Sequence, residues 1–425
     1  MVRSSFRMKY VLFLVSLLMA VPIVGRATPI VRVQLRVEPS TYSFTCRYTF
    51  TLPATDTASV TSLQVNREFR IGHVSSPGAT TQRLGRTYYP YFGDTLQRVV
   101  VRYATAAHRR AREVSLAYAG TLGKPYVTEQ GMVFSGHTNW LPFRPYHEYE
   151  VVEYELEVQV PAPYQVLSTA TAQRQGAGNW FFRGRASAIE ITALVGRQFQ
   201  QLTSATSPSI RVAKTGPTLA RADTVLLHKA EGIIAFYNRT IGQQDPIAHF
   251  SVLLPGTNAD AFGVLDNATV ITYTDFDVAA DREALLILAH EISHKWWGYG
   301  SVHNYNDWLN EAFATYSSLL YLRETGDEAG YRAELAKRVA TVGDAPPIRG
   351  FDYQQYPRPM YRRVIYNKGT AVLAALHERL GTAQFVRLLA TVAARHVSTT
   401  DTFLDVVAQT NSPATRDWLL AELSR

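Results

Sequence analysis

Residues 288–294 read LAHEISH, and this stretch decides the fold of the part of the chain around it. From Arg282 to Trp297 apolar residues recur at helical spacing, which predicts a helix. Positions i and i+4 share one helix face, so His290 and His294 would present two imidazoles to the same side. They can bind one Zn²⁺, with Glu291 as general base beside the open coordination position. A helix whose histidines only pack or face solvent would show the same letters.

A second motif supplies a third ligand, which a catalytic zinc needs in addition to its water. Residues 307–316 read DWLNEAFATY and open another helical pattern, Trp308 to Thr325. Glu311 stands there among Leu, Ala and Phe, which are poor neighbours for an isolated carboxylate. A first-turn glutamate favoured by the helix dipole is the alternative explanation. We predict that His290, His294 and Glu311 hold one zinc ion per chain.

Three motifs in this order resemble the aminopeptidase N family of gluzincin zinc metallopeptidases: HEISHKWWG from residue 290, WLNEAFA from residue 308 and YNKG from residue 366. The resemblance implies an α+β protein. An amino-terminal β-rich domain, sandwich-like or saddle-like, would precede a thermolysin-like, mostly helical zinc peptidase domain. The resemblance also implies that Tyr366 holds the oxyanion of the tetrahedral intermediate, because a phenol donates without ionising at neutral pH. The alternative is that Tyr366, one of 24 tyrosines, packs locally.

Residues 263–267, GVLDN, occupy the place of the family's strand whose glutamate binds the free amino terminus of the substrate. By resemblance Gly263, Asp266 and Asn267 would contact substrate, although Asp266 is one methylene shorter than glutamate. A turn at Asp266 is the alternative. An exopeptidase needs an acid for the amine and an endopeptidase does not. We therefore predict an aminopeptidase acting on peptides and keep two alternatives, an endopeptidase and a catalytically silent binding module of the same fold.

The residues one helical turn either side of Glu311 are candidates for orienting the ligand histidines. Asp307 and Thr315 both have oxygen atoms that can accept the second N–H of an imidazole. The large helical domain that follows in long family members has no counterpart before Arg425, so we expect an open cleft.

The chain before the zinc motifs predicts a β-rich domain over residues 28–205, and residues 206–425 form the predicted catalytic domain. Gln201 to Ser209, QLTSATSPS, is polar and small, which is typical of an interdomain linker. The alternating runs that predict strands are Ile30–Val37, Val99–Tyr103, Tyr149–Val160, Trp180–Phe182, Ile189–Leu194, Phe250–Leu254 and Val270–Tyr273. Further helical patterns are Thr218–Ile241, Gly330–Val342, Lys368–Leu380, Thr382–Arg395 and Asp401–Gln409.

Residues 1–27 have the layout of a secretory signal peptide. Arg3, Arg7 and Lys9 precede the apolar run Tyr10–Val24, and small residues follow it. A membrane-anchoring helix is the alternative, but the run is short for the ~20 residues of a span. We expect export, to a periplasm or outside the cell, and no membrane contact after cleavage.

The amino-acid composition limits the classes of binding partner and the kinds of cross-link that we expect. A hydrophobic content of 46% with 18% charged residues is typical of folded domains. The formal net charge is +8, and no block of basic residues is interleaved with aromatics, so we expect no nucleic acid. Cys46 is the only cysteine, which excludes an intramolecular disulfide. Nothing in the sequence specifies an oligomeric state.

Overall fold

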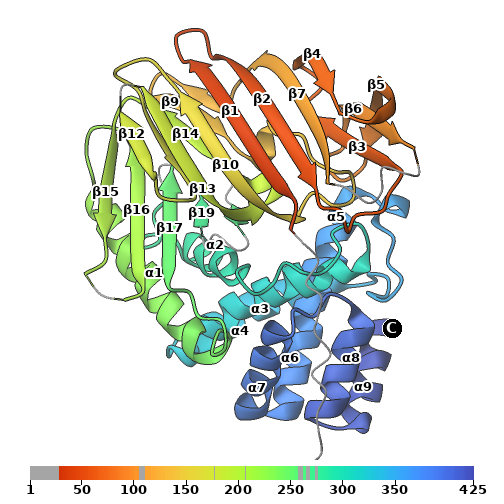
Figure 1. Ribbon diagram of the computed structural model, residues 1–425. Coiled ribbons are helices and arrows are strands. Elements are labelled where there is room, and N and C mark those ends of the chain that lie inside the picture. The colour runs from red at the N-terminus through yellow and green to blue at the C-terminus, as the bar shows by residue number, and fades with distance from the viewer. Residues whose placement is uncertain are drawn as a thin grey trace, which may run out of the picture.

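The computed structural model describes residues 28–104, 111–176, 178–205, 207–256, 262–264, 269–272 and 276–425. Residues 1–27, and with them the predicted signal peptide, lie outside these ranges, so export stays a prediction. Figure 1 shows a sheet-rich region over the first half of the chain and helices over the second. The predicted α+β class is confirmed.

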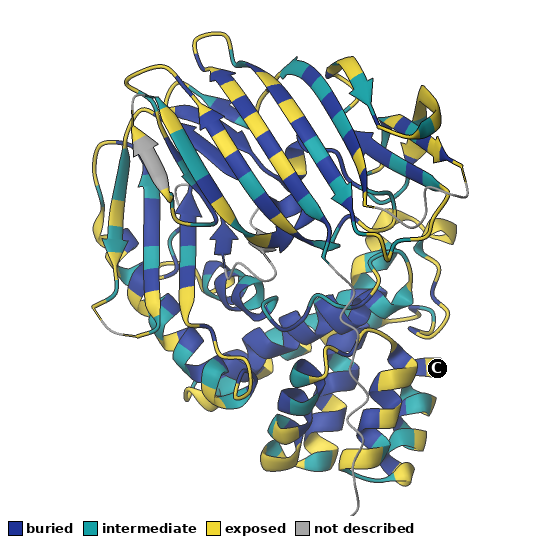
Figure 2. Ribbon diagram, in the orientation of Figure 1, coloured by how far each residue is buried: buried dark blue, intermediate teal, exposed yellow. Residues whose placement is uncertain are grey.

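A seven-stranded sheet dominates the first region, in the order β12-β13-β10-β1-β2-β7-β4. Buried and exposed residues alternate along β1, so that Val31, Val33 and Leu35 face the core while Arg32 and Gln34 face solvent. Figure 2 shows the same stripes on the neighbouring strands. The strands are β1 (Ile30–Glu38), β2 (Ser43–Leu52), β4 (Arg70–Ser75), β7 (Arg112–Thr121), β10 (Val151–Gln159), β12 (Arg174–Gly176) and β13 (Asn179–Ser187).

Two smaller sheets complete this region. Trp140 and Phe134 are fully buried in the core, where the Tyr118 hydroxyl donates to the Trp140 carbonyl at 2.7 Å. Cys46 is buried in the same core, and burial raises the pKa of its thiol to about 12. The strands are β11 (Gln165–Ser168), β14 (Ala193–Gly196), β9 (Gly131–Phe134) and β8 (Val127–Thr128) in one sheet, and β3 (Val60–Val65), β6 (Asp94–Tyr103) and β5 (Ala79–Tyr89) in the other.

A five-stranded sheet leads into the helical region, in the order β15-β16-β17-β19-β18. Its strands are β15 (Phe199–Thr203), β16 (Ser209–Thr215), β17 (His249–Leu254), β18 (Phe262–Val264) and β19 (Thr269–Ile271). β15 and β16 form an antiparallel hairpin. The described residues at both ends of the segment predicted as a linker, Gln201–Ser209, belong to this hairpin, and the Ile210 amide donates to the Ser204 hydroxyl at 2.8 Å. The domain boundary near residue 205 stays a prediction.

All seven predicted helices are present, with small differences at their ends. The helices are α1 (Arg221–Thr240), α2 (Arg282–Ser293), α3 (Trp308–Glu324), α4 (Glu328–Val342), α5 (Arg358–Tyr361), the π-helix η6 (Arg362–Lys368), α6 (Gly369–Leu380), α7 (Thr382–Ala394), α8 (Thr400–Thr410) and α9 (Pro413–Ser424). Of these, α5, η6 and α9 are additional. α3 is buried on nearly every side, as expected of a helix that is apolar all round. α2 ends at Ser293 rather than Trp297, because the chain turns where the Trp296 and Trp297 amides both donate to the Ser293 carbonyl.

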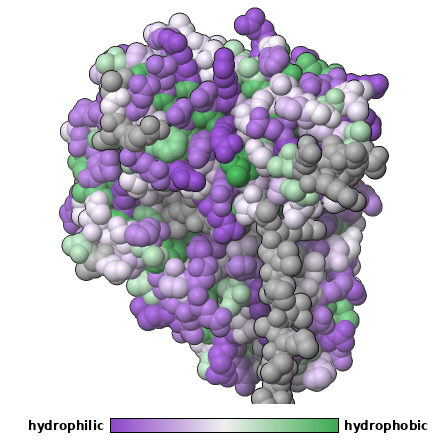
Figure 3. Space-filling model, viewed as in Figure 1, coloured by the Kyte–Doolittle hydropathy of each residue, from purple (hydrophilic) through white to green (hydrophobic). Residues whose placement is uncertain are grey.

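The surface in Figure 3 is mostly hydrophilic, with hydrophobic residues in small separate spots. Within the described ranges, no helix combines the length and apolar character that crossing a bilayer requires.

Candidate metal centre and active site

The predicted ligands converge where α2 packs against α3. Nε2 of His290 lies 3.1 Å from Nε2 of His294, and Oε2 of Glu311 lies 3.3 Å from the first and 3.8 Å from the second. Tetrahedral zinc with bonds of about 2.0–2.1 Å holds neighbouring ligand atoms about 3.3 Å apart. The three donor atoms are therefore spaced to share one ion.

The chemistry of these donors also fits zinc. Oε2 of Glu311 is shielded from solvent and receives no well-directed hydrogen bond from any described residue. A buried acceptor without a partner is costly, and a bound cation would remove that cost. The carboxylate of Glu291 lies within 4.8 Å of both histidine nitrogens, where it can act on water beside the ion. Two imidazoles and a carboxylate form one of the common donor sets of catalytic zinc.

Contacts on the far side of each imidazole set its orientation. The Thr315 hydroxyl lies 3.3 Å from Nδ1 of His290, as predicted, and Nδ1 of His294 donates to the Trp297 carbonyl at 2.6 Å. Such contacts direct Nε2 toward the metal position. Asp307 does not orient a histidine, because its carboxylate accepts from Asn310 at 2.7 Å and from the Tyr361 hydroxyl.

Burial and neighbouring charges shift the pKa values of the side chains in this centre. Burial raises the pKa of Glu311, but His290 and His294 outweigh burial and lower it to about 2. Burial lowers the pKa of His294, but the Glu311 and Glu291 carboxylates outweigh it and raise that pKa. Burial, followed by the Glu311 and Asp307 carboxylates, raises the pKa of Tyr366 well above 10. Tyr366 is therefore a protonated phenol that can donate a hydrogen bond.

Tyr366 stands on the π-helix η6, with its ring parallel to that of His290 at a centroid distance of 6.2 Å. π-Helical turns are rare and frequently occur at functional sites. At the next helix, Gly369 allows close contact with α3, because a Cβ there would lie 2.5 Å from the Cβ of Ala312. This close approach explains the glycine of the YNKG motif.

The two middle residues of that motif hold its backbone in place. The Asn367 amide donates to the Thr341 hydroxyl at 2.7 Å, and the Lys368 ammonium donates to the Ala345 and Pro346 carbonyls at 2.9 and 3.0 Å. Burial lowers the pKa of Lys368. Asn367 and Lys368 thus fix the position of Tyr366.

Residues 226–417 match the model of the peptidase family M1 domain. This part of the chain belongs to peptidase family M1. His290, Glu291, His294, Glu311 and Tyr366 all lie inside the M1 domain. The resemblance to the aminopeptidase N family is thereby confirmed.

Known proteins of this family are similar to the chain over different extents. Endoplasmic reticulum aminopeptidase 2 of Homo sapiens is 22% identical over 214 residues, which are 46% of this chain and 22% of the relative. The Bos taurus protein of the same name is 28% identical over 143 residues, 29% of this chain and 15% of the relative. The chain thus spans about a fifth of the length of these relatives.

Solved structures share the fold over nearly the whole chain. The M1 zinc metallopeptidase of Deinococcus radiodurans has a TM-score of 0.71 at 18% identity, covering 94% of this chain and 95% of that one. A mutant of that enzyme, bound to a Tyr-Ser-Ala substrate, has a TM-score of 0.67 with the same identity and coverage. The predicted zinc cofactor agrees with the description of these enzymes as zinc metallopeptidases.

The predicted substrate strand of the M1 domain is only partly described. Gly263 lies in β18, which pairs antiparallel with β19 at the edge of the five-stranded sheet and packs against α2. Asp266 and Asn267 lie outside the described residues, so their roles stay predictions.

The β-rich region reaches the M1 centre through contacts that we did not predict. Oε1 of Glu148, which is 1% exposed, lies 2.6 Å from Nε2 of His303 in the connection between α2 and α3. The Tyr89 hydroxyl donates to Oε2 of Glu148 at 3.1 Å. Burial raises the pKa of Tyr91, and although its hydrogen bond with Tyr149 acts to lower that pKa, the nearby Asp307 and Glu311 charges raise it further. Only long-range contacts reveal these residues, because no local motif marks them.

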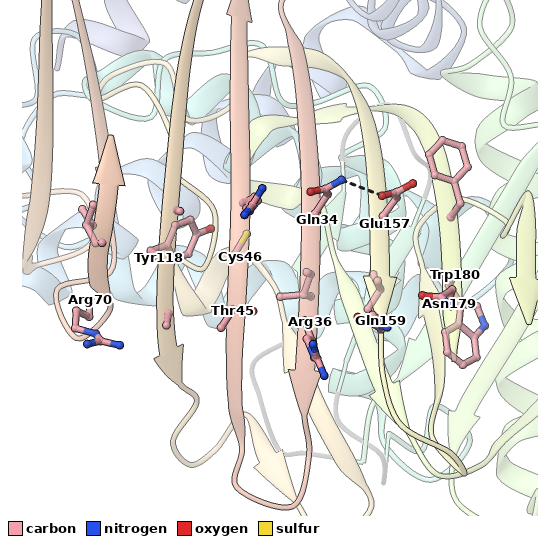
Figure 4. A pocket seen from close by; sticks show the side chains of 18 of the residues that line it. Gln34, Arg36, Thr45, Cys46, Arg70, Tyr118, Glu157, Gln159, Asn179 and Trp180 are labelled. Carbon is pink, nitrogen blue, oxygen red and sulfur yellow. Dashed lines mark hydrogen bonds between the residues drawn. The ribbon is translucent and has the colours of Figure 1, made fainter. Parts of the chain in front are cut away.

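A hollow with a volume of about 1070 Å³ lies away from the predicted site residues (Figure 4). It is an open depression on the solvent face of the seven-stranded sheet, where Gln34 donates to Glu157 at 3.2 Å. None of the predicted site residues lines it. The site is therefore assigned from the ligand geometry and not from the size of a cavity.

Proposed function

We propose that the protein is a zinc-dependent metallopeptidase that acts as an aminopeptidase on peptides. The observation that carries this proposal is the convergence of His290, His294 and Glu311, with Glu291 beside them. The curated relatives carry the name aminopeptidase, and a mutant of the D. radiodurans enzyme binds a Tyr-Ser-Ala substrate, which supports peptides as the substrate class.

The residues divide the reaction between them. His290, His294 and Glu311 would hold the zinc, which when bound supplies a Lewis acid for the scissile carbonyl and lowers the pKa of water. Glu291 takes a proton from the attacking water and delivers it to the nitrogen of the leaving amine. Tyr366 donates its phenolic proton in a hydrogen bond to the oxygen that becomes negative. No side chain forms a covalent bond to the substrate.

The amino-terminal specificity rests on residues 263–267. We propose that Asp266 binds the free amine of the substrate, with Gly263 and Asn267 beside it. Aspartate is shorter than the glutamate of the family, so the amine would bind deeper in the site. Internal cleavage, as by an endopeptidase, is the outcome expected if Asp266 does not reach the amine.

The test compares the wild-type protein with Glu291→Gln on a mixed peptide library, with products identified by mass spectrometry. Removal of single amino-terminal residues by the wild type alone would support the aminopeptidase, and internal cuts would favour an endopeptidase. Loss of cleavage with a chelator and recovery with zinc would establish the metal dependence. A zinc-loaded wild-type protein that cleaves nothing would overturn the proposal in favour of a binding module.

A further inference from the structure

An arginine lies directly over the ring of Tyr366. Arg362 is the first residue of η6, and its Cζ lies 4.8 Å from the centroid of the Tyr366 ring. Its side chain is exposed, and no acidic group of the described residues lies within ion-pair distance. The next residue differs, because the Arg363 guanidinium is held by the Asp344 carboxylate at 2.8 Å and by the Val342 carbonyl at 3.0 Å. Arg362 therefore offers a positive charge that no described side chain neutralises.

This charge stands close to the bond that the centre would cleave. The centroid of the Tyr366 ring lies 6.2 Å from the centroid of the His290 ring, and Cζ of Arg362 lies 4.8 Å from the same Tyr366 centroid. The guanidinium therefore lies no farther from the ring of His290, a proposed zinc ligand, than these two distances added together. An extended peptide advances about 3.3–3.6 Å per residue. The guanidinium is thus within reach of a group two or three residues away from the cleaved bond.

The positive charge of Arg362 determines which side of the cleaved peptide bond it can bind. The amino-terminal side of an aminopeptidase substrate carries a cation, which Arg362 would repel. The leaving side of a short peptide ends in a carboxylate, and a longer peptide can carry an acidic side chain there. The planar guanidinium matches a carboxylate with two parallel hydrogen bonds. The positive charge and the donor geometry of Arg362 therefore fit the leaving side.

We propose that Arg362 binds a carboxylate two or three residues beyond the cleaved bond and so makes the enzyme selective for substrates that carry one. The carboxylate is the carboxyl terminus of a tripeptide or tetrapeptide, or an acidic side chain of a longer peptide. This inference rests on the proposed peptidase function and specifies the substrate class of the same site.

The experiment compares kcat/KM for a tripeptide and a tetrapeptide, each as the free acid and as the carboxyl-terminal amide. We expect the wild type to prefer the free acid about tenfold, as for a charge-assisted hydrogen bond at a partly exposed site. Arg362→Gln should bring the acid-to-amide ratio close to one, and Arg362→Lys should retain part of the preference. Arg387→Gln, which removes the same charge from an exposed position on α7, should leave the ratio unchanged.

Two further comparisons separate the explanations. Amide-capped peptides with aspartate or asparagine two residues beyond the bond show whether a side chain can replace the terminal carboxylate. If Arg362 only positions Tyr366, Arg362→Gln will lower kcat for acid and amide equally and leave their ratio unchanged, which would overturn the proposal. Equal turnover of acid and amide by the wild type would also overturn it.

A binding measurement keeps this inference distinct from the proposed function. Zinc-loaded Glu291→Gln protein, titrated calorimetrically with the free-acid and amide tripeptides, should bind the acid about tenfold more tightly. Adding Arg362→Gln should remove that difference. Absence of turnover by the wild type with this binding preference intact would contradict only the peptidase proposal. Equal binding of the two peptides would contradict the role of Arg362.

Discussion

The hydroxyl of Thr315 lies 3.3 Å from Nδ1 of His290, on the opposite side of the imidazole from Nε2, which lies 3.3 Å from Glu311. α3 therefore carries both a proposed zinc ligand, Glu311, and a contact that orients another proposed ligand, His290. Thr315→Val should weaken zinc binding about tenfold or more, because the ring loses the group that fixes its orientation. Competition with a chromogenic chelator measures this change. Thr315→Ser keeps the hydroxyl and should bind zinc as the wild type does, and equal affinity in Thr315→Val would contradict the role.

Glu291→Gln should keep one zinc per chain and lose activity by about 10²–10⁴-fold, because glutamine cannot accept the proton of the attacking water. Metal analysis of the purified variant and initial rates on one peptide are the two measurements. Glu283→Gln, a change of the same kind on the first turn of α2, is the matched control and should retain both zinc and activity. Wild-type rates in Glu291→Gln would show that another group acts as the base.

Tyr366→Phe should lower kcat by about 10²–10³-fold with little change in KM, because the hydroxyl acts on charge that develops only in the transition state. Tyr356→Phe removes a hydroxyl from an exposed tyrosine of the preceding segment and should behave as the wild type. A rise in KM alone for Tyr366→Phe would assign the hydroxyl to substrate binding instead.

Gly369→Ala should destabilise the protein and reduce its activity. The new methyl would meet the Cβ of Ala312, so α6 and η6 would have to move away from α3, at a cost of about 1–3 kcal/mol. Gly232→Ala is the matched change in α1, where the nearest atom lies 3.5 Å from the new Cβ, and it should stabilise the helix by up to about 1 kcal/mol. Urea unfolding and peptide turnover of both variants test the contrast, and equal stabilities would contradict it.

Because of His377, the free energy of unfolding of the protein should decrease in acid. It is fully buried between the Tyr316 and Thr382 hydroxyls, and burial, followed by the Arg323 charge, lowers its pKa from 6.5 to about 4. Between these values the unfolded chain binds a proton that the folded chain does not. The contribution, at most about 3 kcal/mol, is therefore complete above pH 6.5 and is lost as the pH falls to about 4.

Urea unfolding at neutral pH and at about pH 4.5 measures this dependence. His377→Gln offers an amide to the same two hydroxyls and has no proton to gain, so its stability should depend less on pH. An equal loss in acid for the two proteins would show that other groups cause it.

The convergence of the proposed metal ligands could be predicted because each motif is local. On a helix a spacing of four residues fixes the side that His290 and His294 share, and the apolar neighbours of Glu311 indicate a buried carboxylate. The pair Glu148–His303 could not be predicted, since its members meet only after the β-rich region packs against the connection between α2 and α3. The Trp297 carbonyl is a backbone group, which no sequence letter records.

Alternating burial marks some of the strands, as along β1, and leaves others without a signal in the sequence. β5 was missed because nearly all its residues before Tyr89 face solvent, so no apolar alternation marks it. The predicted strand Ile189–Leu194 is partly wrong, because residues 188–190 form a 3₁₀ turn and β14 begins at Ala193. That run is apolar since it is buried, and burial alone does not separate a strand from a tight turn.

The hairpin of β15 and β16 bears on any attempt to produce the two halves separately. The polar composition around residue 205 would suggest starting a catalytic fragment there. That fragment would lack β15, so the backbone groups of β16 that pair with β15 would be left unpaired. An exposed strand edge of this kind promotes aggregation. A fragment that starts between β14 and β15, near Arg197, would keep the five-stranded sheet whole. An expression trial designed from the sheet order would therefore begin several residues earlier than one designed from composition.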